Sequence, residues 1–323
     1  MNKLERRILW GVILGVIIYA AIGLLTDARS LAAELLDFPL RTFAGALGLT
    51  LVNYALRFLK WHYYLRRLGH RVEWLHSLNV FLAGLVMSVT PGKVGEVLKS
   101  LLLRDSRGIP AAQTAPIVIA ERLTDLLGLF VIAGVGIISF DFGRPVFVAS
   151  LIVVAASILF LQQPRLVTGL LDLWQRFPVV GSMRPKLDEA YASMRRLLTL
   201  PVLAWTTLLS VLAWSMEALA FYWILVTLGA SETTLYLAFF IYAITTILGA
   251  VSFLPGGLGV TEGSMIGVLL LSGVFAAQST AAAATYLIRF ATLWFGVLVG
   301  FVALIVFRST HVQSVNSPEP EVE

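Results

Sequence analysis

Apolar runs long enough to cross a lipid bilayer recur along this chain and constrain its fold more than any other feature. Several windows of about 20 residues are predominantly apolar, the length that a helix needs to span the hydrocarbon layer. Hydrophobic residues occupy 58% of the 323 positions and charged residues only 13%, whereas a soluble domain carries about 25% charged residues. We therefore predict an all-α polytopic membrane protein, because backbone polar groups in lipid must be satisfied within each helix.

Six full crossings are predicted from the apolar runs, over residues 8–25, 42–59, 112–138, 146–161, 201–228 and 278–307. The first follows a basic segment and resembles a secretory signal sequence. Its apolar run is longer than a typical signal core and no clear small-x-small cleavage site follows it, so an uncleaved first crossing is expected. The chain is then a single membrane domain over residues 1–308, with an interfacial cytoplasmic loop at 162–200 and a disordered polar tail at 309–323.

Two further apolar units, residues 75–104 and 235–272, are each broken by a motif of the form P-G-x-x-G. Residues 91–96 read Pro-Gly-Lys-Val-Gly-Glu, and residues 255–262 read Pro-Gly-Gly-Leu-Gly-Val-Thr-Glu. The arms of the first unit, about 15 and about 10 residues, are too short to cross. We predict re-entrant helical hairpins packed inside the bundle, because broken backbone at depth must be buried in protein or face water. For the second unit, whose first arm is longer, full crossing remains the alternative.

The distribution of lysine and arginine predicts that both termini are cytoplasmic. Eighteen of these residues, among them Arg57, Lys60 and Lys99, flank the crossings on the side of the membrane where the N-terminus lies. Only Arg29, Arg41 and Arg144 flank the crossings on the opposite side. In this topology residues 42–138 and 201–307 form two inverted repeat units. Paired breaks in two such halves are typical of a midplane binding site in transporters.

The basic balance and the aromatic residues are both interpreted as membrane features. The chain has 24 lysines and arginines against 19 acidic residues. Because the basic residues cluster beside apolar runs, we assign the excess to anionic lipid headgroups and not to nucleic acid. Trp61, Tyr63, Tyr64 and Trp74 are expected to form an interfacial aromatic belt.

Two arginines are the strongest candidate binding residues. Arg122 and Arg289 follow the two break prolines by 31 and 34 positions and are expected near the middle of the bilayer, at about 15 Å depth. A charge at that depth costs about 3 kcal/mol unless it is paired or hydrated. Asp125 is spaced to pair with Arg122 along one helix and shares a face with Glu121. The partner of Arg289 is expected among three glutamates, Glu96, Glu217 and Glu262, or is a bound anion.

We interpret the arginines as ligands for the phosphate of a lipid headgroup, because a guanidinium group binds phosphate oxygens in pairs and stays protonated. The second arm of each hairpin would add free N–H groups and a positive helix end. The break residues in that role are Pro91, Gly92, Lys93, Gly95, Pro255, Gly256, Gly257 and Gly259. Glu121 or Glu217 could accept a proton during transport.

A purely structural interpretation stays open beside this one. Glu96 and Glu262 would then only favour the helix dipole in a first helical turn, and Arg122 would form a static salt bridge with its acids. No catalytic residue, metal site or cofactor is predicted. The chain has no cysteine, its 4 histidines lack metal-ligand spacing, and no nucleotide-binding or serine-hydrolase motif is present.

Four motifs in order resemble the lysylphosphatidylglycerol synthase transmembrane region, a family of flippase-like membrane proteins of bacteria and archaea. These are Pro91–Glu96, Glu121-Arg122-Leu-Thr-Asp125, Pro255–Glu262 and Arg289. The resemblance implies a protein of the plasma (inner) membrane that moves lipids or lipid-linked intermediates between leaflets. Full-length synthases add a cytosolic aminoacyl-transferase domain. Only the short tail follows here, so lipid aminoacylation is not expected.

The expected function is a flippase-like transporter of an anionic phospholipid or a lipid-linked phosphate, such as a polyprenyl or glycolipid phosphate. Membrane lipid is the expected partner, and the sequence specifies no partner protein. Two alternatives stay open. One is a membrane-embedded transferase, or an accessory subunit of one, in which Glu121 or Asp125 acts as a base. The other is a small-anion or ion-coupled secondary transporter of the same architecture.

Overall fold

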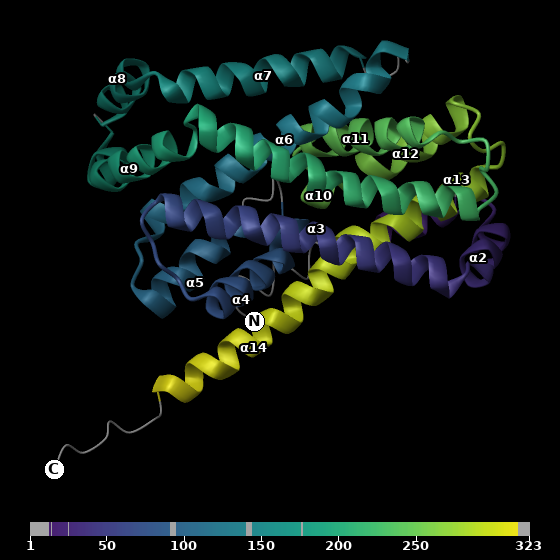
Figure 1. Cartoon of the computed structure of the whole chain (residues 1–323), viewed down its shortest axis with the longest axis horizontal. Coiled ribbons are helices and arrows are strands. Elements are labelled where there is room, and N and C mark those ends of the chain that lie inside the picture. The colour runs from purple at the N-terminus through teal and green to yellow at the C-terminus, as the bar shows by residue number, and fades with distance from the viewer. Residues whose placement is uncertain are drawn as a thin grey trace.

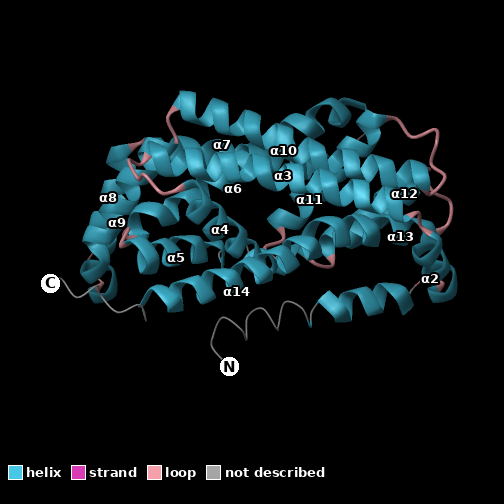
Figure 2. Cartoon of the chain, turned by 60° about the horizontal axis from the view of Figure 1, so that its bottom comes forward, coloured by secondary structure: helices cyan, strands magenta, loops and turns pink. Residues whose placement is uncertain are grey.

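The chain folds into a helical bundle, as the sequence predicts. The structure is a computed structural model and describes residues 13, 15–24, 26–90, 95–139, 144–175 and 177–315. Among these residues it contains helices and loops and no strand (Figure 2). The predicted contributions of Pro91, Gly92 and Lys93 fall outside the described residues.

The helices follow one another with short connections. They are α2 (Ala28–Asp37), α3 (Leu40–Arg67), α4 (Trp74–Gly84), α5 (Leu98–Arg107), α6 (Ala111–Ser139), α7 (Arg144–Gln162), α8 (Pro164–Trp174), α9 (Pro178–Leu197), α10 (Leu200–Thr227), α11 (Leu235–Val251), α12 (Val260–Leu271), α13 (Gln278–Arg289) and α14 (Phe295–Val315). Two 3₁₀ segments, η1 (Leu85–Val89) and η3 (Pro255–Gly257), and one π-helical turn, η4 (Phe290–Trp294), lie between these helices. Residues 15–24 are also α-helical, and residues 95–97 form a further 3₁₀ turn.

Among the described residues, four helical segments are long and apolar enough to cross a membrane, against six predicted. They are α3, α7, α10 and the run Gln278–Ser309. A fifth is obtained if Gly15–Leu24 and α2, which meet at 113°, are counted as one crossing. The predicted crossing at 112–138 coincides with α6, a 29-residue helix with three ionisable residues in its middle, Glu121, Arg122 and Asp125. Residues 8–12, 14 and 25 of the predicted crossing at 8–25 lie outside the described residues.

Both predicted breaks separate short helices, and the two broken units extend from opposite ends of the bundle. In Figure 1, α4 and α5 lie at the end that carries α8 and α9, whereas α11 and α12 extend from the end that carries α2 and α13. The broken tips meet, because η1 contacts η3. A methyl group added at Gly256 would lie 3.6 Å from the Cα atom of Val89. The chain therefore brings the end of the first arm of the first unit against the second interruption.

A small apolar cluster fixes the two tips against the last crossing. Val89 from the first unit and Leu258 from the second pack with Leu293 and Val297 and form a core separate from the main one. Further along, α14 crosses α4 and η1. A Cβ atom at Gly300 would lie only 2.2 Å from the backbone nitrogen of Val86, so this close crossing requires glycine.

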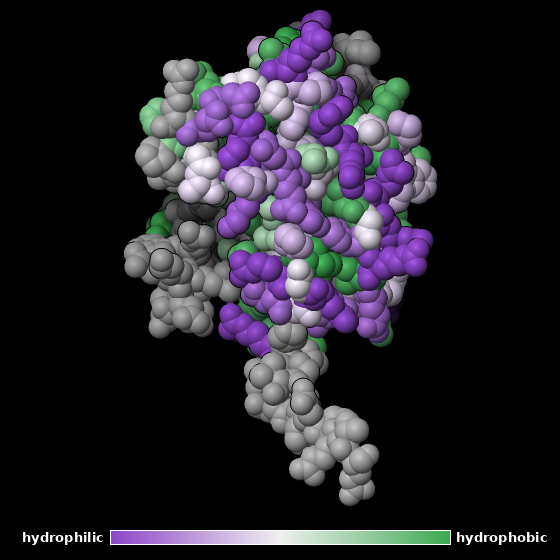
Figure 3. All heavy atoms as spheres, turned by 90° about the vertical axis from the view of Figure 1, so that its left-hand side faces the viewer, coloured by the Kyte–Doolittle hydropathy of each residue, from purple (hydrophilic) through white to green (hydrophobic). Residues whose placement is uncertain are grey.

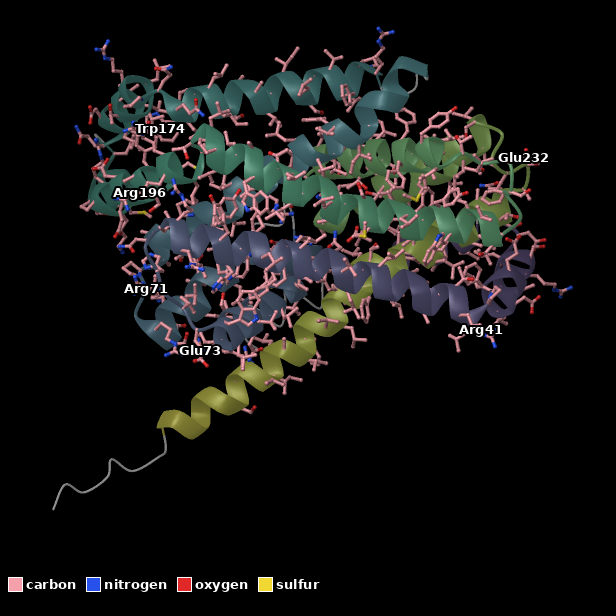
Figure 4. The ribbon with its side chains drawn as sticks, in the orientation of Figure 1. Arg41, Arg71, Glu73, Trp174, Arg196 and Glu232 are labelled. Atoms are coloured by element: carbon pink, nitrogen blue, oxygen red, sulfur yellow. The ribbon has the colours of Figure 1, made fainter. Side chains whose placement is uncertain are left out.

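Basic side chains gather at one end of the bundle, as the charge count predicts. Figure 4 places Arg71 and Arg196 at the end with α8 and α9, and Arg41 at the opposite end. The space-filling view of the first end is largely hydrophilic (Figure 3). There Arg184 of α9 donates a 2.6 Å hydrogen bond to Asp172 of α8, and hydrogen bonds to Asp172 and then Asp188 raise the pKa of this arginine.

Three basic residues counted as flanking the membrane are instead buried. The exposed fractions are 7% for Arg57, 1% for Lys60 and 2% for Lys99. Arg57 and Lys60 are buried because α3 packs against both α6 and α10. Their partners are carboxylates, Glu96 for Arg57 and Asp125 for Lys60. These three residues therefore do not belong in the count of exposed lysines and arginines at the two ends of the bundle.

The predicted aromatic belt is also partly wrong. Trp61 and Tyr64 are completely buried, because they share the packed side of α3, whereas Trp74 is 49% exposed. At the C-terminus, α14 continues to Val315, past the start of the predicted tail at residue 309. The rest of that tail lies outside the described residues.

Candidate functional site

Among the described residues, seven ionisable side chains form a largely buried cluster around the first broken unit. We call it the first-unit cluster. It consists of Arg57 and Lys60 from α3, Glu96 and Lys99 at the start of the second arm, and Glu121, Arg122 and Asp125 from α6. Four cations thus face three carboxylates in the interior. Such groups are expensive to bury unless each charge has a partner.

Glu96 is the centre of the first-unit cluster. One of its carboxylate oxygens lies 3.2 Å from Arg122 and 3.6 Å from Lys99, and the other lies 4.0 Å from Arg57. Three cations from three separate segments therefore meet at one carboxylate. The glutamate that follows the first break connects the broken unit to α3 and α6.

The other acids of the cluster pair mainly with the two lysines. Lys60 Nζ lies 2.5 Å from Asp125 and donates a 2.7 Å hydrogen bond to Ser210. Asp125 also pairs with Arg122 at 3.3 Å, the spacing that the sequence predicts. Lys99 pairs with Glu121 at 2.6 Å and lies 4.5 Å from the ring centre of Trp61, a cation–π contact.

The second broken unit contains a simpler arrangement around Arg289. Its Nε lies 2.6 Å from Glu262, and a terminal nitrogen donates a 2.7 Å hydrogen bond to the carbonyl oxygen of Gly256. Among the three candidate glutamates, Glu262 is thus the partner. Glu262 also accepts a 2.7 Å hydrogen bond from the backbone N–H of Gly259 and a 3.3 Å bond from Tyr19. Glu262 therefore caps the start of α12 and pairs with Arg289 at the same time.

The glycines of the second break allow this geometry locally. Gly256, Gly257 and Gly259 all have positive φ angles, of 61°, 68° and 85°, a region that side chains with a Cβ atom rarely adopt. The resulting turn aims the carbonyl of Gly256 at Arg289 and starts α12 with Glu262 in its first turn. The P-G-x-x-G motif therefore shapes a binding partner for the arginine.

The backbone just after Arg289 is also irregular. Residues 290–294 form a π-helical turn, a feature that is often found at functional sites. Within this turn the carbonyl oxygen of Thr292 accepts a 2.8 Å hydrogen bond from the hydroxyl group of Tyr54 on α3. The contact joins the second unit directly to the helix that carries Arg57.

A cavity of about 270 Å³ lies between the two units. Three guanidinium groups, of Arg57, Arg122 and Arg289, and two carboxylates, of Asp125 and Glu217, contribute to its wall. Glu217 accepts a short hydrogen bond from the hydroxyl group of Tyr242. Apolar side chains, Leu85, Leu126, Leu129, Trp214, Phe253, Leu254 and Leu293, form much of the remaining wall.

One part of the wall reaches the molecular surface. Phe253 and Leu254, between α11 and η3, are 72% and 43% exposed. Phe253 has a φ angle of 54° and is the non-glycine residue in the described chain with a positive φ, a strained conformation for an aromatic residue. The cavity is thus bordered by two exposed apolar side chains beside the second break.

The predicted site residues divide into a wall and a supporting layer. Arg122, Arg289, Asp125, Glu217, Gly256 and Gly257 line the cavity. Gly95, Glu96, Glu121, Pro255, Gly259 and Glu262 do not line it. Of these, Glu96 and Glu262 hold the arginines. Glu121 is occupied by Lys99.

Sequence reasoning missed the contribution of α3 to this wall. Arg57 was counted as a flanking charge, yet it lies in the cavity with Tyr54. A signal was present, since Thr50, Asn53, Arg57 and Lys60 recur at helical spacing and form one polar face. All four side chains are buried. A polar stripe inside an apolar helix indicates that this face points into a bundle.

The described residues contain no group of three histidine, cysteine or acidic side chains that could hold a metal ion. Except for Glu217, which accepts a hydrogen bond from Tyr242, the acids of the site pair with arginines and lysines instead. What the site offers chemically is fixed positive charge, one carboxylate hydrogen-bonded to a tyrosine and an apolar wall.

Comparison with known proteins was made after this geometry was established. The sequence profile of the lysylphosphatidylglycerol synthase transmembrane region matches residues 12–300. A UPF0104 membrane protein of Methanothermobacter thermautotrophicus is 26% identical over 325 aligned positions, covering 93% of this chain and 95% of that protein. A second UPF0104 membrane protein of the same organism is 27% identical over 198 positions, covering 56% of this chain and 58% of that protein.

Proposed function

This chain belongs to the family of the lysylphosphatidylglycerol synthase transmembrane region, and we propose that it moves an anionic phospholipid or a lipid-linked phosphate between the leaflets of a prokaryotic plasma membrane. One observation carries the proposal. The cavity between the two broken units is lined by guanidinium groups from three helices. Arginine is the side chain best suited to bind phosphate oxygens.

The charges of the cavity favour an anion over a cation. The acids around it are engaged, since Asp125 pairs with Lys60 at 2.5 Å and Glu217 accepts a hydrogen bond from Tyr242. The arginine side chains keep access to the cavity, with exposed fractions of 21% for Arg122 and 12% for Arg289. A phosphate group would meet positive charge in a site that water does not fully screen.

The apolar part of the wall supports a lipid over a soluble anion. A headgroup bound at the arginines leaves its acyl chains to pass apolar side chains, and Phe253 and Leu254 lie exposed where the cavity wall reaches the surface. In this proposal the exposed pair faces lipid. A soluble anion would gain nothing from such a border.

The two broken units are proposed as inverted repeats that change access to the cavity in turn. Each contains two short helices, a P-G-x-x-G break and a following glutamate, and an arginine from the next helix along the chain pairs with that glutamate. The units extend from opposite ends of the bundle (Figure 1). Rocking of one unit against the other around a fixed central site is the usual mode of transport in such architectures.

Transport is tested by reconstituting the purified protein in vesicles and following a fluorescent phosphatidic acid across the bilayer. We expect transfer by the wild-type protein and its loss in Arg122→Gln and Arg289→Gln. Arg41→Gln, an exposed arginine at one end of the bundle, is the matched control and should transport normally. If both cavity variants move lipid like the wild type, the assigned site is wrong.

The same preparation separates the two alternatives. Saturable flux of inorganic phosphate without lipid movement would support a small-anion transporter. Product formed from an activated sugar donor and a lipid phosphate would support a transferase. Mass spectrometry of lipid that co-purifies with the protein identifies the headgroup directly.

We also propose that both termini face the cytoplasm, from the basic residues at the end with α8 and α9. The chain has no cysteine, so single cysteines report sidedness without background. In intact cells, Glu232→Cys should react with a membrane-impermeant maleimide, and Arg196→Cys should react only after lysis. The reverse pattern would invert the proposed orientation.

A further inference from the structure

We propose that Arg57 and Arg122 together bind a lipid phosphate that carries two negative charges, such as a phosphate monoester or a diphosphate, while Arg289 remains in its own ion pair. This inference rests on the proposed function and specifies it. It names which arginines hold the anion and which class of headgroup they select.

Within the part of the chain that the structure describes, Arg57 has hydrogen-bonding capacity that no other residue uses. Its side chain lines the cavity and is 8% exposed. Among the described residues its one ion-pair contact is with Glu96, and the two atoms are 4.0 Å apart. This distance exceeds the range of an N–H···O hydrogen bond. A guanidinium group has five donors, so Arg57 offers a charged fork to a ligand in the cavity.

Arg122 is only partly satisfied as well. One terminal nitrogen lies 3.2 Å from Glu96 and 3.3 Å from Asp125. Its Nε atom is buried and has no hydrogen-bond partner among the described residues. A buried donor without a partner is costly, and a bound oxygen would remove that cost.

Glu96 places these two arginines next to each other. Arg57 approaches one oxygen of this carboxylate and Arg122 approaches the other. The first arginine comes from α3 and the second from α6, so the arrangement depends on tertiary packing. Two adjacent guanidinium groups match a group with several terminal oxygens.

Arg289 differs because two of its nitrogen atoms already donate short hydrogen bonds within the protein. Its Nε is bound to Glu262 at 2.6 Å and a terminal nitrogen to the carbonyl oxygen of Gly256 at 2.7 Å. Free capacity for an anion is therefore concentrated on the first unit. The cavity is asymmetric in chemistry although the two breaks have the same motif.

The charge count then selects the headgroup. A zwitterionic headgroup brings an amine, which would meet three guanidinium groups and two carboxylates that are already bonded to Lys60 and Tyr242. A phosphate monoester brings three terminal oxygens and two charges, and a phosphodiester brings two oxygens and one charge. The paired arginines favour the phosphate monoester over the phosphodiester.

Binding of short-chain lipids to the purified protein in detergent tests the inference. Calorimetric titrations use dihexanoyl phosphatidic acid, dihexanoyl phosphatidylcholine and inorganic phosphate. We expect the wild type to prefer phosphatidic acid. Arg57→Gln should weaken that binding by about ten- to a hundredfold, as expected for the loss of charged hydrogen bonds. Binding of phosphatidylcholine should change little.

Two further variants make the result specific. Arg57→Lys keeps the charge and removes the fork, so its affinity should be intermediate. Arg66→Gln removes an exposed arginine from the same helix and should bind like the wild type. Melting temperatures of all variants are recorded, and Arg57→Lys decides the question if Arg57→Gln does not fold.

Each remaining outcome contradicts a different statement. Phosphatidic acid bound equally by the wild type and by folded Arg57 variants would overturn the role of Arg57 and leave the proposed function intact. Inorganic phosphate bound as tightly as phosphatidic acid would overturn a lipid as the source of the phosphate. A wild-type protein that binds no anionic lipid would contradict the proposed function itself.

Discussion

The two broken units share a motif but hold their arginines in different ways. In the first unit Glu96 lies within 4.0 Å of three cations, and the cluster around it contains seven ionisable side chains. In the second unit Glu262 pairs with Arg289, and backbone groups of the break provide the other contacts. One unit is held by side chains from other helices, and the other mainly by its own glycine turn.

This difference teaches that a repeated motif fixes the position of a charge but not its environment. Both glutamates follow a break and both pair with a later arginine. The surplus cations of the first unit come from α3 and α5, whereas the second unit has no matching cation among its described residues. Anion-binding capacity can therefore be unequal in two units with the same sequence pattern.

The largest expected effect comes from breaking a pair in the first-unit cluster. Lys99→Met leaves Glu121, which is 2% exposed, without its 2.6 Å partner. An uncompensated buried charge costs about 3–5 kcal/mol, so the melting temperature in detergent should fall steeply. The double variant Lys99→Met with Glu121→Leu should recover much of the loss. A double variant as unstable as the single one would show that this pair is not what stabilises the unit.

The second prediction compares the two arginines directly. Arg289→Met leaves Glu262, which is fully buried, without its cation and should cost about 3 kcal/mol. Arg122→Met leaves Glu96 with Lys99 and Arg57 and should cost about 1 kcal/mol. Unfolding of both variants under identical conditions checks the order. Equal losses would mean that the extra cations of the first unit do not compensate.

A third, smaller effect is expected where α14 crosses the first unit. Gly300→Ala places a methyl group 2.2 Å from the backbone of Val86 and should cost about 1–3 kcal/mol through overpacking. Gly263→Ala in the second unit meets nothing within 4 Å and should be neutral or slightly stabilising, since alanine favours a helix. Thermal unfolding of the two variants measures the contrast, which disappears if the crossing is loose.

The smallest effect concerns the contact between α3 and the π-helical turn. Tyr54→Phe removes the 2.8 Å hydrogen bond to the carbonyl oxygen of Thr292 and should cost about 1 kcal/mol. Because Tyr54 also lines the cavity, lipid transfer is measured beside the melting temperature. A stability equal to that of the wild type would show that the turn holds its shape without α3.

Some of the site was predictable because it follows from local rules. Proline and glycine disfavour a continuous helix, so the P-G-x-x-G breaks predict short helices, and the structure has a short helix on either side of each break. The Arg122–Asp125 pair follows from helical spacing, and the exclusion of a metal-bound thiolate follows from composition. Glu262 was one of three glutamates considered beside a bound anion as the partner of Arg289, and only the turn at Gly256 and Gly259 identified it.

By itself the sequence determined that this chain is an all-helical membrane protein with two interrupted units, because apolar length and glycine–proline breaks act within a few residues. Only the tertiary structure decided that Arg57, Lys60 and Lys99 are buried partners and not charges at the membrane surface. In the sequence, a lysine or arginine beside an apolar run looks the same whether its side chain is buried or lies at the membrane surface. The packing of α3 against α6 and α10 places these cations beside carboxylates that are distant in sequence, and no local pattern encodes that meeting.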